Sequence, residues 1–118
     1  MTDDLGNDHE DIDVETVGVS TVVRPYGEMD VTRSQDFREV LLAALSADGP
    51  GREVVVDLQH LSFCDSAGLN ALLDARARAE ATGQRLSLAA PRGQFTRLLE
   101  ITGTAHLFPI TPPPGTPS

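Results

Sequence analysis

The 118-residue sequence contains no lysine and no tryptophan, a single cysteine, and only five aromatic residues. Without a lysine, the glycine-containing stretch Gly49–Arg52 lacks the key residue of a Walker phosphate loop. One cysteine excludes an internal disulfide and a metal cage built from cysteines. No apolar run approaches the ~20 residues that span a bilayer. The N-terminal residues Met1–Asp4 are acidic rather than an apolar signal segment. We therefore expect a cytoplasmic protein that is a poor candidate for a kinase or NTPase.

The negative charge is concentrated at one end of the chain. The formal net charge is −9, and seven of the eighteen acidic residues fall within residues 1–15, where there is no base. Such a segment has too little apolar surface to fold, so residues 1–12 are predicted to form a disordered acidic tail. Residues 111–118 are predicted to form a disordered, proline-rich tail. Because no basic face is evident, we do not expect direct binding to nucleic acid.

Between these tails, residues 13–110 are predicted to form one domain. Alternating or β-branched patterns predict strands at 13–24 (one or two strands turning at Gly18), 54–58, 86–88 and, briefly, 107–108. Apolar stripes at helical spacing predict three helices: the first capped by Thr32 or Ser34 and stopped at 48–51, the second running from Ser66 to about Thr82, and the third opened by Pro91 and ended by Gly103. Strands that alternate with amphipathic helices indicate an α/β fold, with a small mixed sheet and helices packed on it.

The most informative stretch is residues 61–69, which read LSFCDSAGL. Asp65 is a good N-cap residue, so Ser66 falls in the first turn of the second helix. Backbone N–H groups at that point lack intrahelical partners and the helix dipole is positive, so a phosphate on Ser66 would be tolerated. Asp and Ser are also ordinary capping residues, and taken alone these few residues favour that structural role. The position nevertheless suits a switch.

Other chemistry at these residues is disfavoured. Ser66 lies outside a Gly-x-Ser-x-Gly elbow and no histidine is placed to activate it, so we predict no catalytic residue. Asp57 and Asp65 could form a carboxylate pair or bind Mg²⁺, but a strand end and a helix cap are the favoured interpretations, and no metal site is predicted. Cys64 is interpreted as a small buried hydrophobe rather than a redox sensor.

The order of the motifs carries a family resemblance. Residues 27–30 (GEMD) follow a strand, then come a helix, the valine strand and the LSFCDSAGL stretch, and residues 98–103 (LLEITG) precede 107–110 (LFPI). In this order they resemble the STAS family, the sulfate-transporter and anti-sigma-factor-antagonist domain. The resemblance is to its free-standing bacterial anti-sigma factor antagonists and covers residues 14–110. It implies the STAS fold and a protein without enzymatic activity.

The resemblance also implies a mechanism called partner switching. An antagonist of this kind binds an anti-sigma factor, which is a serine kinase, and so releases a sigma factor. The kinase uses its own ATP and Mg²⁺ to phosphorylate the antagonist, here at Ser66, and a separate serine phosphatase reverses the reaction. No cofactor is expected in this chain. The expected partner-binding residues are Gly27, Glu28, Asp30, Asp65, Ala67, Gly68 and Leu69.

Several alternatives remain open. Glu28 and Asp30 either form salt bridges with a partner or belong to a turn with a helix cap, and Leu69 is either a core residue or an exposed anchor. The whole domain could instead be a structural STAS subunit of a signalling or lipid-transport assembly that is not phosphorylated. A STAS module that binds a small ligand or nucleotide is a further alternative.

Overall fold

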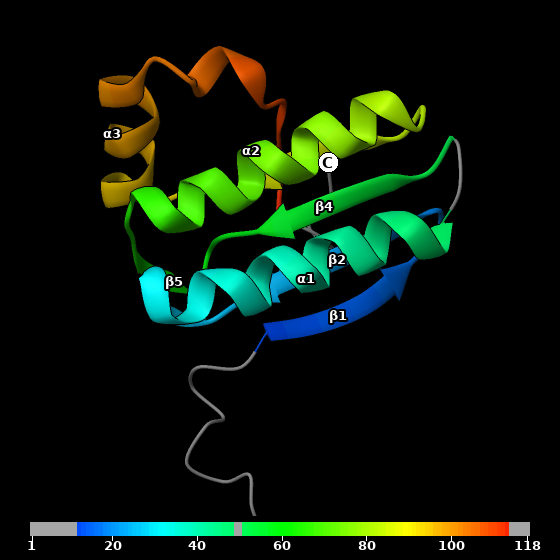
Figure 1. The fold of residues 1–118 in the computed structure, drawn as a ribbon, viewed down its shortest axis with the longest axis horizontal. Helices are drawn as coiled ribbons and strands as arrows, with labels where there is room; N and C mark the ends of the chain where they lie inside the picture. Colours follow the sequence, from blue (N-terminus) through cyan, green and yellow to red (C-terminus); the bar gives the residue numbers. More distant parts are fainter. Residues whose placement is uncertain (1–11, 49–50, 114–118) are drawn as a thin grey trace, which may run out of the picture.

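Two long helices lie side by side across one face of a five-stranded sheet in the computed structural model, which describes residues 12–48 and 51–113 (Figure 1). The sheet has the order β1-β2-β4-β6-β7, with β1 antiparallel to β2 and the other neighbours parallel. The bounds are β1 Ile12–Val17, β2 Ser20–Pro25, β4 Glu53–Asp57, β6 Arg85–Ala89 and β7 Ile110–Thr111, with helices α1 Val31–Asp48 and α2 Ser66–Ala81. The predicted α/β class, with a small mixed sheet and helices packed on it, is confirmed.

Beside this sheet lies a second, two-stranded sheet that the sequence did not predict. It is formed by β3 (Gly27–Met29) and β5 (Leu61–Cys64), which run parallel. Both segments are short, and each flanks a helix start, so their local patterns resemble turns. The register shifts between Gly27 and Glu28, and Gly27 has a φ of +76°, a conformation that suits glycine at an irregularity of this kind.

The N-terminal hairpin follows the sequence closely. Gly18 has a φ of +61° in the two-residue turn that joins β1 to β2, and Pro25 is the last residue of β2, as expected for a residue without an N–H. β1 begins at Ile12 and β7 ends at Thr111, each one residue outside the predicted domain limits. The predicted tails fall mainly on residues 1–11 and 114–118, outside the described residues.

The cap of α1 differs from the prediction. The helix begins at Val31, before both predicted caps, Thr32 and Ser34. Asp30 serves as the cap instead, because its Oδ1 accepts hydrogen bonds from the backbone N–H groups of Thr32 at 3.0 Å and Arg33 at 3.3 Å. A carboxylate reaching the first free N–H groups is the usual N-cap geometry. This is the structural role that we considered for Asp30.

The C-terminal elements also differ in detail. The third helix, α3, spans Gly93–Thr102 with Arg92 at the cap position, so it starts two residues after Pro91, and Gly103 ends it with a φ of +71°. The brief strand predicted around 107–108 lies further along the chain, because a 3-10 helix covers Ala105–Leu107 and β7 follows it. Phe108 is buried without being in a strand. Its apolar character reflects burial, which the sequence pattern alone cannot distinguish from strand pairing.

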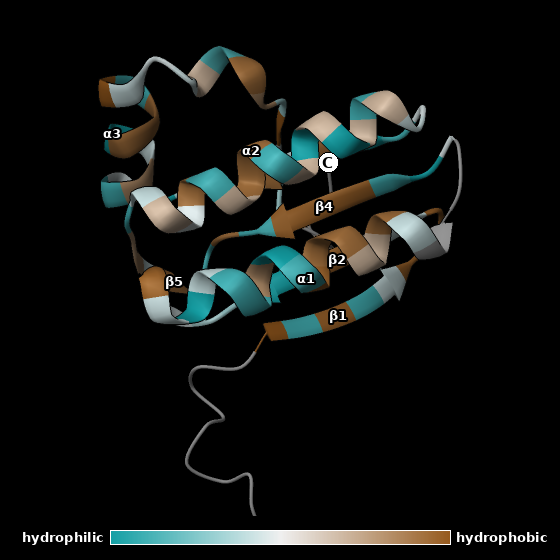
Figure 2. Cartoon of the chain, in the orientation of Figure 1, coloured by the Kyte–Doolittle hydropathy of each residue, from teal (hydrophilic) through white to brown (hydrophobic). Residues whose placement is uncertain are grey.

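The core lies between the helices and the sheet. Val54 and Val56 of β4 pack there against Leu41 of α1 and Leu72 of α2, all fully buried, and Figure 2 shows β4 as an apolar strand. Burying each such side chain contributes about 1.5–3 kcal/mol. On the opposite face of the sheet, Val55 belongs to a smaller cluster. In the described part of the chain, no helix is long and apolar enough to cross a membrane.

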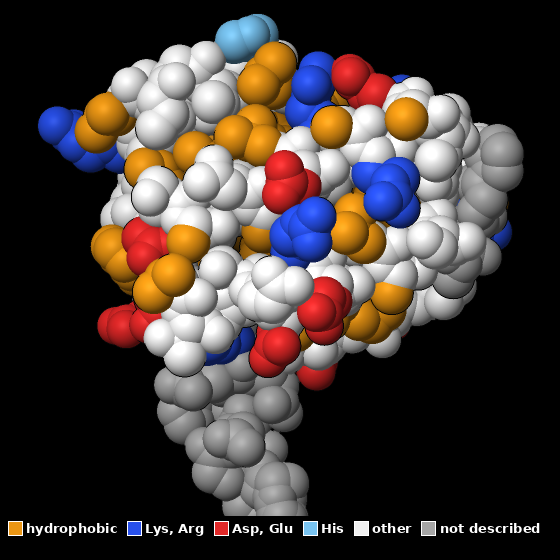
Figure 3. All heavy atoms as spheres, in the orientation of Figure 1, with side chains coloured by type: hydrophobic (Ala, Val, Ile, Leu, Met, Phe, Trp, Pro, Cys, Tyr) orange, Lys and Arg blue, Asp and Glu red, His pale blue; other side chains and the backbone are white. Residues whose placement is uncertain are grey.

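The outer surfaces of α1 and α2 carry acidic and basic side chains in alternation, and no large basic patch is visible on this face (Figure 3). One such pair joins the two helices, because Arg38 Nε of α1 lies 3.0 Å from Asp74 Oδ2 of α2. Both side chains are largely exposed, so the pair contributes at most about 1 kcal/mol to stability.

Candidate functional site

The start of α2 has the geometry that the sequence predicts. Asp65 is the N-cap residue, with extended backbone angles, and its Oδ1 accepts hydrogen bonds from the N–H groups of Ala67 at 2.9 Å and Gly68 at 3.3 Å. Ser66 is the first helical residue, and its side chain is exposed. The hydroxyl is therefore accessible to another protein.

The cap geometry bears on how a phosphate on Ser66 would be tolerated. The Asp65 carboxylate already accepts from the backbone N–H groups of Ala67 and Gly68. That carboxylate also places a negative charge beside the hydroxyl. A phosphate here would depend on solvent exposure and the helix dipole, not on free backbone donors.

The β3–β5 pairing brings the two predicted halves of the site together. Glu28 lies opposite Phe63 and Met29 opposite Cys64, and the N–H of Asp65 donates to the carbonyl of Met29 at 3.1 Å. Residues 27–30 therefore lie directly beside the start of α2, although more than thirty residues separate them in the sequence. This proximity is a consequence of strand pairing.

The residues beneath the site are tightly packed. Gly68 is buried, and a Cβ added there would lie 2.5 Å from Cys64 Sγ and 2.8 Å from Met29 Cγ. Leu69 is also buried and belongs to the core, which settles the alternative left open for it. Neither Gly68 nor Leu69 can offer a side chain to a partner in this conformation. Their role is to hold the first turn of α2 against the core.

Cys64 is a buried hydrophobe, as the sequence indicates. Burial, together with the nearby charge of Asp65, raises the pKa of its thiol to about 12. The thiolate is the reactive form of cysteine, so a thiol held protonated at neutral pH is a poor redox sensor.

Two side chains that the sequence analysis did not single out stabilise this small sheet. The Gln94 amide accepts from the N–H of Cys64 at 2.9 Å and donates to its carbonyl at 2.8 Å, as a neighbouring strand would. On the β3 side, the Arg33 guanidinium donates to the carbonyls of Tyr26, at 2.9 Å, and Glu28. No local pattern marks these residues, because the strands they contact were not predicted.

The exposed groups around Ser66 are mixed in character. Glu28 and Phe63 are paired in register on neighbouring strands, so their side chains lie on the same side of the small sheet; both are exposed, Phe63 by 41%. Val31, at the start of α1, is 72% exposed, and Ala67 is half-buried. Two exposed apolar side chains near an acidic one and a hydroxyl form a surface suited to contact with a protein.

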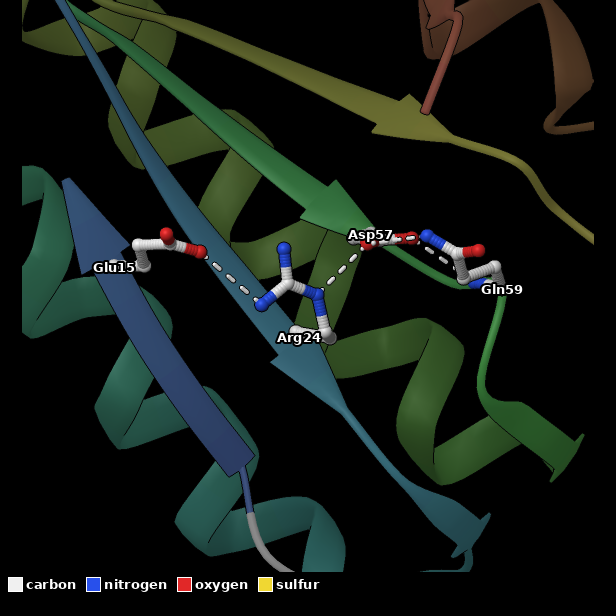
Figure 4. A network of polar contacts seen from close by, with 4 residues as sticks. All are labelled: Glu15, Arg24, Asp57 and Gln59. Atoms are coloured by element: carbon white, nitrogen blue, oxygen red, sulfur yellow. Dashed lines mark hydrogen bonds and ion pairs between the residues drawn. The ribbon is translucent and has the colours of Figure 1, made fainter. Parts of the chain in front are cut away.

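Asp57 lies on the helix-free face of the sheet and takes no part in this surface. It is fully buried, and its carboxylate bonds Arg24 Nε at 2.9 Å and both the backbone N–H and the side-chain amide of Gln59 at 3.1 and 2.9 Å (Figure 4). Burial alone would raise its pKa, but the hydrogen bonds from Arg24 and Gln59 outweigh burial and hold the pKa below the ordinary value. Glu15 lies 3.3 Å from the other side of the same guanidinium.

Asp57 and Asp65 therefore act as structural residues and do not form a shared carboxylate pair, because the hydrogen bonds of each are made to different partners. Among residues 12–48 and 51–113 there is no group of three or more histidine, cysteine or acidic side chains that could hold a metal ion.

Comparison with known proteins gives matches over most of the chain. A family model described as "Mlab, STAS domain" matches residues 12–110. The anti-sigma-B factor antagonist of Staphylococcus aureus is 30% identical over 88 residues, which cover 75% of this chain and 80% of that protein. An anti-sigma factor antagonist from Mycobacterium paratuberculosis has a crystal structure that matches with a TM-score of 0.74 at 25% identity, covering 85% of this chain and 83% of that one. The unphosphorylated form of the antagonist SpoIIAA shares the fold, with a TM-score of 0.72 at 21% identity over 86% of this chain and 88% of that one.

Proposed function

The chain belongs to the STAS domain family, and from that membership we propose that it is an anti-sigma factor antagonist inactivated by phosphorylation of Ser66. Unphosphorylated, it binds an anti-sigma factor that is a serine kinase and thereby frees a sigma factor. The kinase supplies ATP and Mg²⁺, and a separate serine phosphatase restores the unmodified form. The observation that carries the proposal is the exposed Ser66 hydroxyl in the first turn of α2, next to the Asp65 cap. The chain itself has no catalytic role.

The proposed contact surface consists of the exposed groups on α2 and the β3–β5 sheet. Glu28, Phe63, Ser66 and the half-buried Ala67 face the kinase. Gly27, Asp30 and Asp65 shape the backbone beside them, while Gly68 and Leu69 fix α2 from beneath. This assignment keeps all the residues expected from the sequence but divides them into contacting and supporting residues.

The proposed switch is electrostatic. A phosphate adds about −1.5 to −2 charges at neutral pH, next to a carboxylate that is already committed to the helix cap. In the docked complex this charge faces the nucleotide phosphates of the kinase across a surface from which water is excluded. A hundredfold loss of affinity requires only about 2.8 kcal/mol, which one like-charge contact at an interface can supply. The fold need not change, because Ser66 is exposed and the residues beneath it remain packed.

The test requires an anti-sigma factor with serine kinase activity from the same organism. Wild type, Ser66→Ala and Ser62→Ala are incubated with that kinase and ATP–Mg²⁺, and intact mass and phosphopeptide maps are recorded. Ser62 is the matched control, since it is an exposed serine four residues away in β5. We expect one phosphate on wild type and Ser62→Ala and none on Ser66→Ala, which still binds the kinase. A label at Ser62, Thr82 or Thr96 would contradict the assignment.

A second experiment measures the affinity of the chain for the kinase by calorimetry with ADP present. Ser66→Asp should bind the kinase more weakly than wild type, but less weakly than the phosphoprotein, because one carboxylate carries a single charge. Equal affinities for wild type and Ser66→Asp would rule out an electrostatic switch. A stable stoichiometric complex without any kinase-dependent mass change would instead indicate a structural STAS subunit. Saturable nucleotide binding to the purified chain would indicate a ligand-binding module.

A further inference from the structure

The open edges of strands differ in how they are protected. An unpaired edge presents free backbone N–H and C=O groups that can pair with another chain, so proteins usually shorten, cap or block such edges. β7 is only two residues long and is followed by Pro112 and Pro113. The outer side of β5 is capped at Cys64 by the Gln94 amide, and Arg33 donates to the carbonyls of Glu28, within β3, and of Tyr26, just before it. Within the described residues, three of the four strand edges are therefore protected.

The fourth edge, on β1, has none of these features. β1 is six residues long, pairs only with β2 in the described part of the chain, and keeps a continuous register without a bulge. It contains neither lysine nor proline. After Ile12, every residue of the strand is exposed. This is the longest unprotected edge among the described strands.

The register identifies which backbone groups point outward. Val17 and Ser20 close the two-residue turn and form a hydrogen-bonded pair, and such pairs alternate with non-hydrogen-bonded ones along an antiparallel ladder. Ile12 therefore stands in a non-hydrogen-bonded pair, which agrees with its partner Pro25 having no N–H. The N–H and C=O groups of Ile12, Val14 and Thr16 consequently point away from β2, toward the open side.

The side chains at this edge determine what kind of strand fits. Asp13 and Glu15 lie on the helix-free face with Arg24 and Asp57, and the Arg24 guanidinium bonds the carboxylates of Asp57 and Glu15. Asp13 lies opposite Arg24 in the register, so this face carries three carboxylates and one guanidinium. The local charge is therefore negative. Val14, on the opposite face of the strand, is 54% exposed and provides an apolar contact.

A second copy of the chain fits this edge poorly. In a two-fold antiparallel pairing centred on Val14, Asp13 of each copy lies opposite Glu15 of the other. In the neighbouring register, Val14 of each copy pairs with Thr16 of the other, and the two Glu15 residues lie opposite one another. Like charges directly opposite each other on neighbouring strands are destabilising. Charge repulsion therefore disfavours pairing of this edge with a second copy, whereas a strand with basic side chains has the complementary charge.

We propose that the outer edge of β1 is a second protein-binding surface, which adds an extended segment of another protein with arginine or lysine alternating with apolar residues. Backbone hydrogen bonds to Ile12, Val14 and Thr16 provide the pairing, and Asp13 and Glu15 select the basic side chains. This surface involves β1, at the edge of the main sheet, and does not depend on the function proposed for Ser66.

The probe is a ten-residue peptide of alternating arginine and valine, with blocked ends, titrated into the full chain at 50 mM salt and followed by backbone NMR. We expect shift changes centred on β1 and slower amide exchange at Val14 and Thr16. The control peptides are an alternating glutamate–valine peptide and the arginine peptide with alternate amides N-methylated. The N-methylated peptide keeps its charge but cannot donate to the edge, so its affinity should fall at least tenfold.

Variants of the protein test the same contacts from the other side. Val14→Pro removes an outward N–H while leaving the hydrogen bonds to β2, and should weaken binding about tenfold, whereas Val14→Ala should change it less than threefold. The double variant Asp13→Asn, Glu15→Gln should also bind about tenfold more weakly. Equal binding of the N-methylated peptide, shift changes centred away from β1, or self-association that Val14→Pro abolishes would each overturn the proposal. The peptide controls decide the matter even where a variant fails to fold.

Discussion

Asp57 and Asp65 occupy comparable places in the chain and have different physical roles. Each stands at the carboxyl end of a strand, Asp57 as the last residue of β4 and Asp65 immediately after β5. Asp57 is fully buried and ion-paired to Arg24, whereas Asp65 is half-buried and its carboxylate accepts hydrogen bonds from the backbone of the helix that it caps. The first holds strands together across the sheet, and the second orients the first turn of α2.

The difference between these two strand ends indicates which of them can accept a change of charge and so act as a switch. Around Asp57 the carboxylate, guanidinium and amide satisfy one another, and any change of charge there leaves a buried group without a partner. The hydrogen bonds of the Asp65 carboxylate are local, and the neighbouring Ser66 is exposed. A charge added at Ser66 is therefore compatible with the folded state, while removal of the charge at Asp57 should reduce its stability.

Removing Asp57 should have the largest effect on stability. Asp57→Ala leaves the Arg24 guanidinium, whose side chain is only 18% exposed, without its main partner. Breaking a buried ion pair from one side costs about 3–5 kcal/mol. Urea unfolding should show this loss, while Glu15→Ala, at the exposed end of the same network, should change stability by less than about 0.5 kcal/mol. Equal losses of stability in Asp57→Ala and Glu15→Ala would mean that the Arg24–Asp57 ion pair contributes no more than an exposed surface ion pair.

The acid stability of the protein should report on the same carboxylate. The pKa of Asp57 is lower in the folded chain than its ordinary value of about 3.9, so its contribution is fully present above that value. The contribution is lost as the pH falls below about 4 and passes through the lowered pKa of the folded state. Consequently, the difference in unfolding free energy between wild type and Asp57→Asn should narrow below pH 4. A difference that stays constant down to pH 2 would contradict the lowered pKa.

The packing beneath the Asp65 cap can be tested at Gly68. In Gly68→Ala the new Cβ would meet Cys64 Sγ and Met29 Cγ at distances shorter than van der Waals contact, and overpacking of this kind costs about 1–3 kcal/mol. Thermal unfolding of Gly68→Ala, Cys64→Ala and the double variant forms a cycle. The double variant should be more stable than the sum of the two single effects predicts, because Cys64→Ala removes the closer contact. Strict additivity would show that α2 moves away instead.

The caps themselves should give a smaller effect. Asp65→Ala and Asp30→Ala each remove a carboxylate that accepts two backbone N–H groups, so each should cost about 1 kcal/mol. The pair is matched, since both residues cap long helices on the same side of the sheet. Chemical unfolding measures the stability of each variant. If Asp65→Ala lowered the free energy of unfolding as much as Asp57→Ala, the two carboxylates would not have different roles in stability.

Ser66→Ala should have the smallest effect on stability, within about 0.5 kcal/mol of wild type, because its side chain is exposed and the Asp65 cap remains. The unfolding midpoint in urea gives the measurement, with Ser62→Ala as the control. A loss of more than 1 kcal/mol would assign Ser66 to the helix cap and weaken the case for a surface switch.

Several features of this protein could be predicted from local sequence alone. Asp65 before an apolar helical stripe predicted the cap of α2, and Gly83 and Gly103, with φ of +73° and +71°, follow the ends of their helices. Alternating valines predicted one or two N-terminal strands with a turn at Gly18, and the structure has two strands paired across that turn. These features depend on contacts within a few residues along the chain, so the local sequence contains the necessary information.

Only the tertiary structure decided the composition of the candidate site. The pairing of β3 with β5 joins Met29 to Cys64, and the Gln94 side chain reaches that pair from thirty residues further along the chain. The same packing buries Leu69, which the helical pattern could not assign to either core or surface. Such pairings depend on the burial of apolar surface across the whole fold. That burial determines which short segments become neighbours. The local sequence therefore determined where a helix begins and which hydroxyl stands there, and long-range packing determined the surface that surrounds it.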